Sequence, residues 1–247
     1  MIKLTKQNFS SYLAEFMVIV LGILVAFQVE EWRDERAEQR DVASSLQRLI
    51  EETEENAERC EMFTELLKPI ALSVQHVYNS LNAGEIIDGD EDKFVRGLVS
   101  FDVVPDVRML TSVANEMIST GLLKELDDSG LRGAIARLPL LDDEARYLLP
   151  YWRTPIIELS SEMTKFADYY YDGEIPSLDR RESFTDSTES SMLVDYDFDV
   201  LASNRKLKNL FFSAVDVHSD LWFGLRERCI LVDEIKNRLE VAIEPRH

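Results

Sequence analysis

The most pronounced feature of the hydrophobic pattern is an apolar run near the N-terminus. Residues 16–27 contain no polar side chain, and Tyr12 and Trp32 flank the run on its two sides. Aromatic residues take such positions at the two interfaces of a membrane. A bilayer core of about 30 Å needs about 20 helical residues, and the run with its nearest neighbours almost reaches that length. The pattern predicts a transmembrane anchor over residues 12–32, preceded by a polar lead over residues 1–11.

Two other interpretations of the apolar run are a buried core helix and a cleaved signal peptide. The early Lys3 and Lys6 suit a signal peptide. No small-x-small cleavage pattern follows the run, however, and the chain continues directly into a charged, helix-forming stretch. Glu15 and Gln28, near the two ends of the run, can extend their polar tips toward lipid headgroups. An uncleaved anchor is therefore our prediction.

Three residues of the predicted anchor share one stripe of the helix. At about 100° per residue, Glu15, Gly22 and Ala26 point to nearly the same side. Gly22 and Ala26 form a small-xxx-small pair, which lets a second helix approach closely. A carboxyl group on this stripe favours protein or the interface over lipid. The stripe indicates a helix–helix contact, with an interfacial glutamate beside two ordinary small residues as the equal alternative.

Apolar residues recur every three or four positions over two long stretches after the anchor, residues 42–81 and 204–244. This spacing predicts two long amphipathic helices whose apolar stripes face each other. Between them we expect shorter helices and then a loop or lid, over residues 91–100, 106–120, 128–138, 141–171 and 172–195 respectively. The fold class we expect is all-α: an N-terminal transmembrane helix continues into a long helix, which packs with the long C-terminal helix in a bundle domain over residues 33–247.

The net charge of the chain is mainly informative about which classes of partner it excludes. The 247 residues include 47 acidic and 27 basic side chains, for a formal net charge of −20. A nucleic-acid-binding surface needs a basic footprint, so no nucleic acid partner is expected. The acidic excess favours solubility and cationic partners. The partners we expect are the lipid bilayer and either a second copy of the chain or another membrane protein.

Few residues of the sequence are candidates for a metal site, a cofactor site or a catalytic role. Cys60 and Cys229 have no C-x-x-C pattern and no Cys/His cluster around them, so we expect no metal site and no cofactor. We expect two free buried thiols, with a single disulfide as the alternative if the body lies outside the cytoplasm. The sequence has no recognisable nucleophile–base pair or phosphate loop, and we assign no catalytic residue.

Aromatic residues crowd the stretch that contains Pro150. Tyr147, Tyr151 and Trp152, together with His218 from the C-terminal helix, form a candidate pocket for a ligand. The alternative is that these aromatic side chains belong to the core. His218 lies on the apolar stripe of its helix, which favours a hydrogen-bonded core histidine over a ligand or a catalyst.

Two motifs resemble those of a known family. The stretch EFMVIVLGILVAFQVEEWRDER is similar to the N-terminal signature of a bacterial domain-of-unknown-function family of small single-pass membrane proteins. The matching positions are Glu15, Gly22, Gln28 and Trp32, while Glu30 and Glu31 replace the usual asparagines. Glu116–Gly121, followed by Leu131 and Arg132, is similar to a second family motif. The resemblance implies the fold and the location, and the family has no established activity.

The flanking charges give conflicting signals on orientation. Lys3 and Lys6 favour a cytoplasmic N-terminus, whereas Arg33, Arg36 and Arg40 favour the opposite. The resemblance supports a cytoplasmic N-terminus, because the relatives have a more basic lead. We expect a single-pass protein of the bacterial inner membrane whose body lies in the periplasm.

Two functions from different classes fit these observations. The first is a non-enzymatic interaction or sensing module of unknown ligand, which self-associates or binds a membrane partner through its anchor. The alternative is a subunit of a transport or enzyme complex that uses Glu15 as a membrane carboxyl group. The lack of a recognisable catalytic constellation favours the first.

Overall fold

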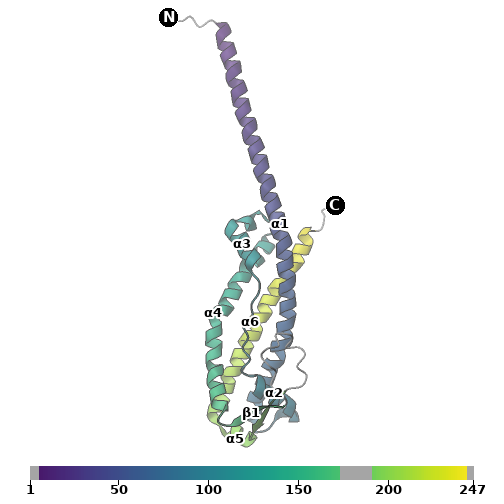
Figure 1. Ribbon diagram of the computed structural model, residues 1–247, viewed down its shortest axis with the longest axis vertical. Helices are drawn as coiled ribbons and strands as arrows, with labels where there is room; N and C mark the ends of the chain where they lie inside the picture. Colours follow the sequence, from purple (N-terminus) through teal and green to yellow (C-terminus); the bar gives the residue numbers. More distant parts are fainter. Residues whose placement is uncertain (1–5, 173–190, 244–247) are drawn as a thin grey trace.

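Three long helices form an elongated bundle, and one of them extends far beyond it (Figure 1). The computed structural model describes the backbone of residues 6–172 and 191–243, with side chains for residues 15–170 and 192–242. α6 packs against both of the other long helices. This arrangement confirms the predicted helical bundle. The long helices are α1 (Lys6–Ala83), α4 (Ser129–Met163) and α6 (Arg205–Ile243).

The core of the bundle is divided into two clusters of buried apolar side chains along its length. Both clusters draw on α1 and α6, whose periodic apolar stripes face each other as predicted. The cluster far from the projecting helix includes Val74, Leu81, Phe94, Leu98 and Phe211. The cluster near it includes Leu49, Leu67, Ile135, Leu225 and Val232.

The prolines of α4 do not divide it, contrary to the prediction. The sequence predicts separate helices over residues 128–138 and 141–171, whereas one helix contains Pro139, Pro150 and Pro155. A proline removes one backbone N–H group and strains the turn before it. Packing against α6 along the bundle stabilises the remaining turns, since tertiary contacts supply most of the stability of a helix.

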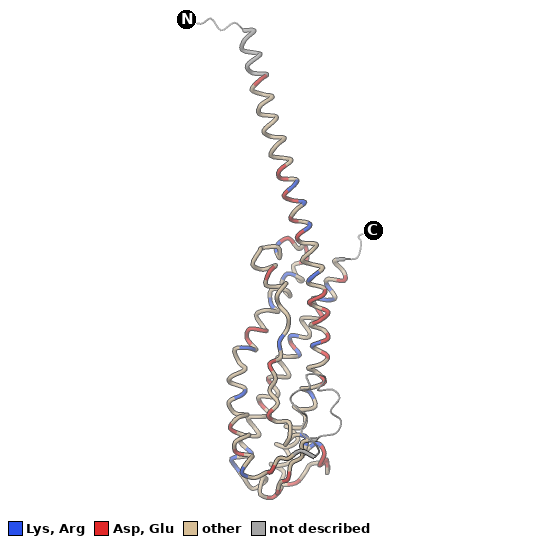
Figure 2. The backbone as a smooth tube through the Cα atoms, in the orientation of Figure 1, with Lys and Arg blue, Asp and Glu red and all other residues tan. Residues whose placement is uncertain are grey.

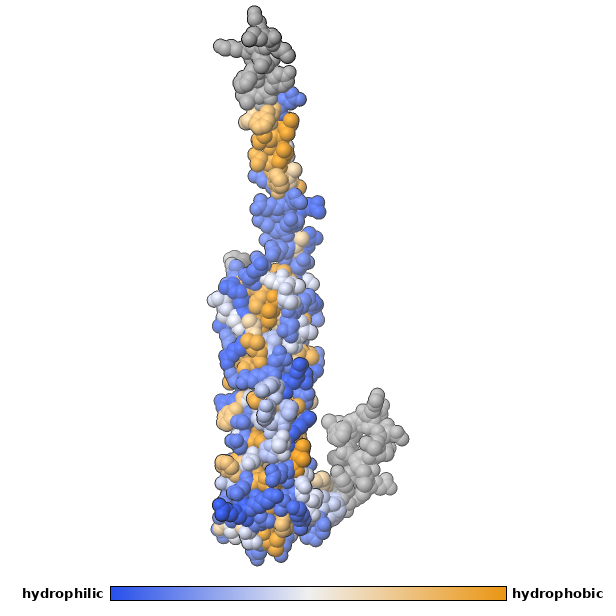
Figure 3. Space-filling model, turned by 90° about the vertical axis from the view of Figure 1, so that its left-hand side faces the viewer, coloured by the Kyte–Doolittle hydropathy of each residue, from blue (hydrophilic) through white to orange (hydrophobic). Residues whose placement is uncertain are grey.

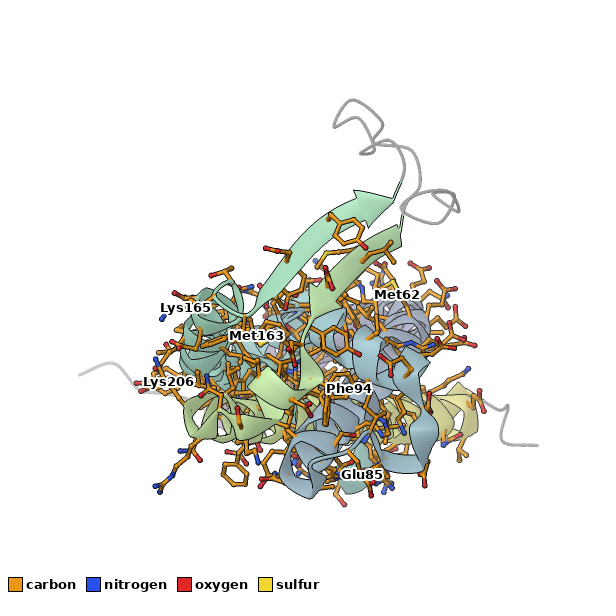
Figure 4. All side chains as sticks on the ribbon, turned by 90° about the horizontal axis from the view of Figure 1, so that it is seen from below. Met62, Glu85, Phe94, Met163, Lys165 and Lys206 are labelled. Atoms are coloured by element: carbon orange, nitrogen blue, oxygen red, sulfur yellow. A yellow bond between two sulfur atoms is a disulfide. The ribbon has the colours of Figure 1, made fainter. Side chains whose placement is uncertain are left out.

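A β-hairpin takes the place of the end of the predicted helix 141–171 and of part of the predicted loop. β1 (Ala167–Asp172) pairs with β2 (Ser191–Tyr196) in an antiparallel ladder. Three consecutive tyrosines in β1 and a Met-Leu-Val run in β2 suit strands. The two strands extend outward from the bundle in the view along its axis (Figure 4). The rest of the predicted lid, residues 173–190, lies outside the described residues.

An extended segment, residues 103–111, separates α2 (Glu91–Ser100) from α3 (Ser112–Thr120). The sequence predicts a helix from residue 106, and this prediction is wrong for the first six residues. A short 3-10 turn (Ile87–Gly89) precedes α2, a second one (Leu122–Glu125) follows α3, and α5 (Phe198–Ser203) follows the hairpin.

Buried polar side chains hold this segment in its extended form. Asp142 of α4 accepts a hydrogen bond from the backbone N of Met109, at 2.9 Å. Asn56 of α1 accepts one from the backbone N of Leu110 at 2.7 Å and donates one to its carbonyl at 2.8 Å. Side chains thus provide the backbone partners that a helix would have provided.

Glu52 of α1 fixes the start of α3. Its carboxylate accepts hydrogen bonds from the Ser112 hydroxyl at 2.6 Å, the Val113 N at 2.9 Å and the Ala114 N at 3.3 Å. The first N–H groups of a helix have no partner within the helix, and a negative charge is favourable there. A side chain from another helix therefore sets this boundary.

Acidic residues that directly precede a helix in the sequence act as its N-cap. Asp90 accepts a hydrogen bond from the Lys93 N at the start of α2, and Asp128 accepts one from the Gly130 N at the start of α4. Gly121 ends α3 with a φ of 82°, a value that favours glycine.

Candidate functional site

The apolar part of α1, residues 16–29, projects from the bundle, and no described side chain of the body covers it. Phe16, Val18 and Phe27 are 61%, 69% and 63% exposed, and the other large apolar residues of this part are also exposed, except for the half-buried Val20. Figure 3 shows it as an apolar band separated from the body by a hydrophilic band. A helix that is apolar on all sides is normally buried, in a large protein or in a membrane. We call residues 16–29 the apolar segment.

Within the described residues, no helix is both long enough and apolar enough to cross a bilayer.

An aromatic residue and a charged stretch mark the end of the apolar segment nearest the body. Trp32 is 52% exposed, and the guanidinium carbon of Arg36 lies 4.0 Å from the centre of its ring. Gln28 is exposed beside them, and the side chain of Tyr12 lies outside the described residues. A tryptophan beside a cation is the arrangement expected where a helix passes from an apolar to an aqueous environment.

The predicted contact stripe lies on the apolar segment and just before it, and none of its three side chains is buried by the described residues. Glu15, Gly22 and Ala26 are all exposed. A Cβ added to Gly22 would meet no atom within 4 Å. The opposite holds for Gly97 of α2, where a Cβ would lie 2.5 Å from the carbonyl oxygen of Ser73. Packing within the chain therefore explains the glycine at position 97 but not the one at position 22.

A charged, uncovered stretch of α1 connects the apolar segment to the body, and we call it the stalk (residues 30–44). Every side chain from residue 30 to residue 41 is exposed, and Ser45 is the first buried residue among the described side chains of α1. Figure 2 shows acidic and basic residues following one another along this part of the helix. At about 1.5 Å per residue, the stalk separates the apolar segment from the bundle by about 20 Å.

The residues of the candidate aromatic pocket do not share one surface. Tyr147 and Tyr151 are 69% and 62% exposed, and their rings lie 5.8 Å apart on the outside of α4. Trp152 packs against the core, and His218 is buried within it. We therefore do not group these four residues as one site.

His218 has the core role that the sequence favours. Its Nε2 donates to the carbonyl oxygen of Phe101 at 2.8 Å, and the Nδ1 atom has no hydrogen-bond partner among the described residues. Burial lowers the pKa of His218 below the ordinary value of 6.5, although the hydrogen bond to Phe101 and the charge of Asp102 oppose this. The neutral imidazole is the form that the core accommodates.

The lowered pKa of His218 predicts that the folded protein is less stable in mild acid. Below about pH 6.5 the unfolded chain binds a proton at this residue more readily than the folded one, so the free energy of unfolding falls as the pH falls. A His218→Gln variant can still donate to Phe101 and does not titrate. We expect urea unfolding between pH 7.5 and pH 5 to show a smaller loss of stability in His218→Gln. An equal loss in both proteins would show that other groups dominate.

The two cysteines form a disulfide, which corrects our expectation of free thiols. The bond joins Cys60 of α1 to Cys229 of α6, with the Cα atoms 5.6 Å apart. The facing stripes of the two helices bring these positions together. Positions 60 and 229 both fall in the predicted series of core positions, so the sequence contained a signal for their proximity but none for their oxidation.

The second motif of the family resemblance connects α3 to α1. The Glu116 carboxylate accepts hydrogen bonds from both terminal nitrogens of Arg48, at 2.7 and 2.8 Å, and this contact lowers the pKa of Glu116. The hydroxyls of Ser119 and Thr120 donate to the Glu116 carbonyl. These residues have structural partners within the chain, which explains their presence without a ligand.

A groove of about 580 Å³ lies between α4 and the chain that follows α2. No sequence pattern predicts this groove, because its walls come from parts of the chain far apart. The Arg153 side chain on one wall donates to the carbonyl of Val104, at 3.4 Å. The lining residues include Asp102, Arg153, Ile156, Ser160 and Thr164.

We compared the chain with protein-family models, with curated proteins and with solved structures, and none of them matches it.

Proposed function

We propose that this protein is a single-pass membrane protein of the bacterial inner membrane whose helical body serves as a non-enzymatic interaction or sensing module. The observation that supports this most is the uncovered apolar segment. Ile19, Leu21 and Phe27 are each more than half exposed, and at about 100° per residue they point to different sides of α1. Apolar surface of this extent is unfavourable in water, at about 25 cal/mol for each Å².

The length and composition of this part of the chain support a membrane environment. The 18 residues from Tyr12 to Val29 include one charged residue, Glu15. α1 begins at Lys6, so the helix contains this whole stretch. Eighteen helical residues rise about 27 Å, close to the thickness of a bilayer core of about 30 Å. Trp32 and Arg36 would then lie at the interface on the body side.

The disulfide supports a periplasmic body. Disulfides persist in the bacterial periplasm and are rare in the cytoplasm. The bond between Cys60 and Cys229 lies in the body, beyond the stalk. Lys3 and Lys6 on the other side of the apolar segment agree with a cytoplasmic N-terminus.

The contacts of the buried polar residues support an interaction module rather than an enzyme. Glu52, Asn56 and Asp142 bind backbone groups of the chain itself, and His218 binds the carbonyl of Phe101. These residues fix the course of the chain across the bundle. The surface left for a partner includes the apolar segment, the stalk and the groove beside α4.

We propose that the anchor contacts another helix through the stripe of Glu15, Gly22 and Ala26. The open surroundings of Gly22 support this, because a leucine there would leave the fold of the single chain unchanged. Gly22→Leu and Ala26→Leu should weaken assembly of the full-length protein in mild detergent, measured by light scattering. Unchanged assembly in both would remove this contact. In the alternative, a transport or enzyme subunit, Glu15 acts as a membrane carboxyl group, and a Glu15→Gln strain with a normal phenotype would argue against it.

Charged residues within the apolar segment should release the protein from the membrane. We expect the double variant Leu21→Asp, Leu24→Asp to move to the soluble fraction after cell lysis and ultracentrifugation, because each aspartate near the centre of a span costs about 3 kcal/mol. The matched control is Leu140→Asp, which changes a residue of the body that is 68% exposed. A soluble wild-type protein, or equal release of the control, would refute the anchor.

A further inference from the structure

The charges of the stalk are sorted onto different faces of the helix. At about 100° per residue, the acidic residues fall within an arc of about 140° and the arginines within an arc of about 60° on the other side. All of these side chains are exposed. The acidic residues are Glu30, Glu31, Asp34, Glu35, Glu38 and Asp41, and the basic ones are Arg33, Arg36 and Arg40.

This sorting does not stabilise the stalk as a lone helix. A helix gains from opposite charges four residues apart and loses from like charges at that spacing. Here Glu30, Asp34 and Glu38 follow one another at that spacing, and so do Arg36 and Arg40. No ion pair joins two stalk residues in the described part of the chain. The uncovered helix therefore carries repulsion along both faces.

A line of small residues runs between the two charged edges. Ala37 and Ser44 lie within about 20° of Ala26, so they continue the small-residue stripe of the apolar segment along the same side of α1. Arg33 and Arg40 border this line on one side, and Glu30 and Asp41 border it on the other. We call these six stalk residues, from Glu30 to Ser44, the seam. Small central side chains let a second helix approach, and the borders have opposite charge.

We propose that the seam pairs with the seam of a second copy of this chain, in parallel, beside the membrane. This inference rests on the proposed membrane anchor, which would hold both helices parallel. A two-fold axis along the helices places the basic border of one copy against the acidic border of the other, on both sides of the contact. Arg40 and Asp41 differ in height by about 1.5 Å, and Arg33 and Glu30 by about 4.5 Å, so both pairs can form.

Self-complementarity favours a second copy over an unrelated partner. One seam contains both charge signs, at matching heights, on either side of the small residues. An unrelated partner could bind through a single border of one charge sign. Such a partner would not require opposite charges at matching heights on the two sides of the seam. Pairing also relieves the repulsion within each stalk, because every border charge gains a neighbour of opposite sign. Since the pairs are exposed, the contact should weaken as the salt concentration rises.

Charge reversal and cross-linking test the pairing in the full-length protein. In a Ser44→Cys background, mild oxidation of native membranes should give a covalent dimer, whereas Gln39→Cys, on the far side of the stalk, should not. Reversal of one border, by Arg33→Glu with Arg40→Glu or by Glu30→Arg with Asp41→Arg, should lower the dimer yield by about tenfold or more. Co-expression of the two reversed chains, with tags of different size, should restore the yield as a heterodimer only.

The outcomes separate this inference from the proposed anchor. The proposed seam pairing would be overturned if charge reversal left the dimer yield unchanged. It would also be overturned if the two co-expressed reversed chains formed no heterodimer. Cross-linking of Ser44→Cys to another polypeptide would overturn it in favour of a different partner. Ultracentrifugation of the same cells reports on anchoring independently, since the reversed residues lie outside the apolar segment. Soluble protein would refute the anchor even if the dimer formed.

Discussion

Loss of the disulfide should lower the free energy of unfolding by about 3–5 kcal/mol. The bond between Cys60 and Cys229 closes a loop of 169 residues, which contains the larger part of the body. Cross-linking distant residues restricts the unfolded chain, and the effect grows with loop length. The double variant Cys60→Ser, Cys229→Ser should therefore unfold at a clearly lower urea concentration, measured by circular dichroism.

The reducing agent provides the control for this prediction. Dithiothreitol should lower the stability of the wild-type protein to nearly that of the serine variant and leave the variant itself unchanged. If the reductant destabilised both proteins equally, its effect would not come from this bond. If neither the variant nor the reductant changed the midpoint, packing between α1 and α6 would hold the two helices together without the covalent link.

Removal of the Glu52 carboxylate should cost about 2–4 kcal/mol of stability. Glu52 is buried and accepts hydrogen bonds from Ser112, Val113 and Ala114 at the start of α3. In Glu52→Ala these donors lose their acceptor inside the body, away from water. Urea unfolding would measure the loss, and hydrogen exchange at the N–H groups of Val113 and Ala114 should become faster.

Glu54→Ala is the matched control, because it removes a carboxylate from the exposed side of the same turn of α1. Substitutions at such surface positions usually change stability by less than about 0.5 kcal/mol. Equal losses in the two variants would show that net charge, rather than the cap on α3, is responsible.

The bundle parts of α1 and α6 could be predicted from the sequence because their signal is repeated many times. α6 runs from Arg205 to Ile243, within one residue of the predicted range 204–244 at each end. Its apolar positions recur at helical spacing over the whole length, so a single unusual residue such as Gly224 does not obscure the pattern. The same repetition placed His218 in the core.

The extended segment and the start of α3 could not be predicted from local sequence. Pro105 and Asp106 form a good local start for a helix. The contacts that overrule this signal come from Glu52 and Asn56, more than fifty residues earlier, and from Asp142, later in the chain. A boundary set by side chains of distant helices leaves no mark in its own neighbourhood.

Part of the candidate site, the apolar segment, could be predicted from the sequence. The apolar segment is contiguous, so the pattern located it directly. The aromatic residues were a weaker guide, because Tyr147 and Tyr151 lie on the outer side of α4 although their spacing also fits a core position. The separation of acidic and basic residues on the stalk is visible in the sequence as like charges that repeat every four residues. Such a repeat is easily interpreted as an ordinary solvent-exposed helix.

The continuity of α1 has a mechanical consequence. The helix runs from Lys6 to Ala83 as one continuous element that includes Pro69, so the part inside the body and the apolar segment belong to the same rod. From Leu21 to Ala83 this rod is about 93 Å long at about 1.5 Å per residue. If the apolar segment is the membrane anchor proposed above, a tilt of about 10° there would move the far end of the body sideways by about 16 Å. A small reorientation within the bilayer would thus become a large displacement at the β-hairpin, and a load applied there would act on the anchor with the same leverage.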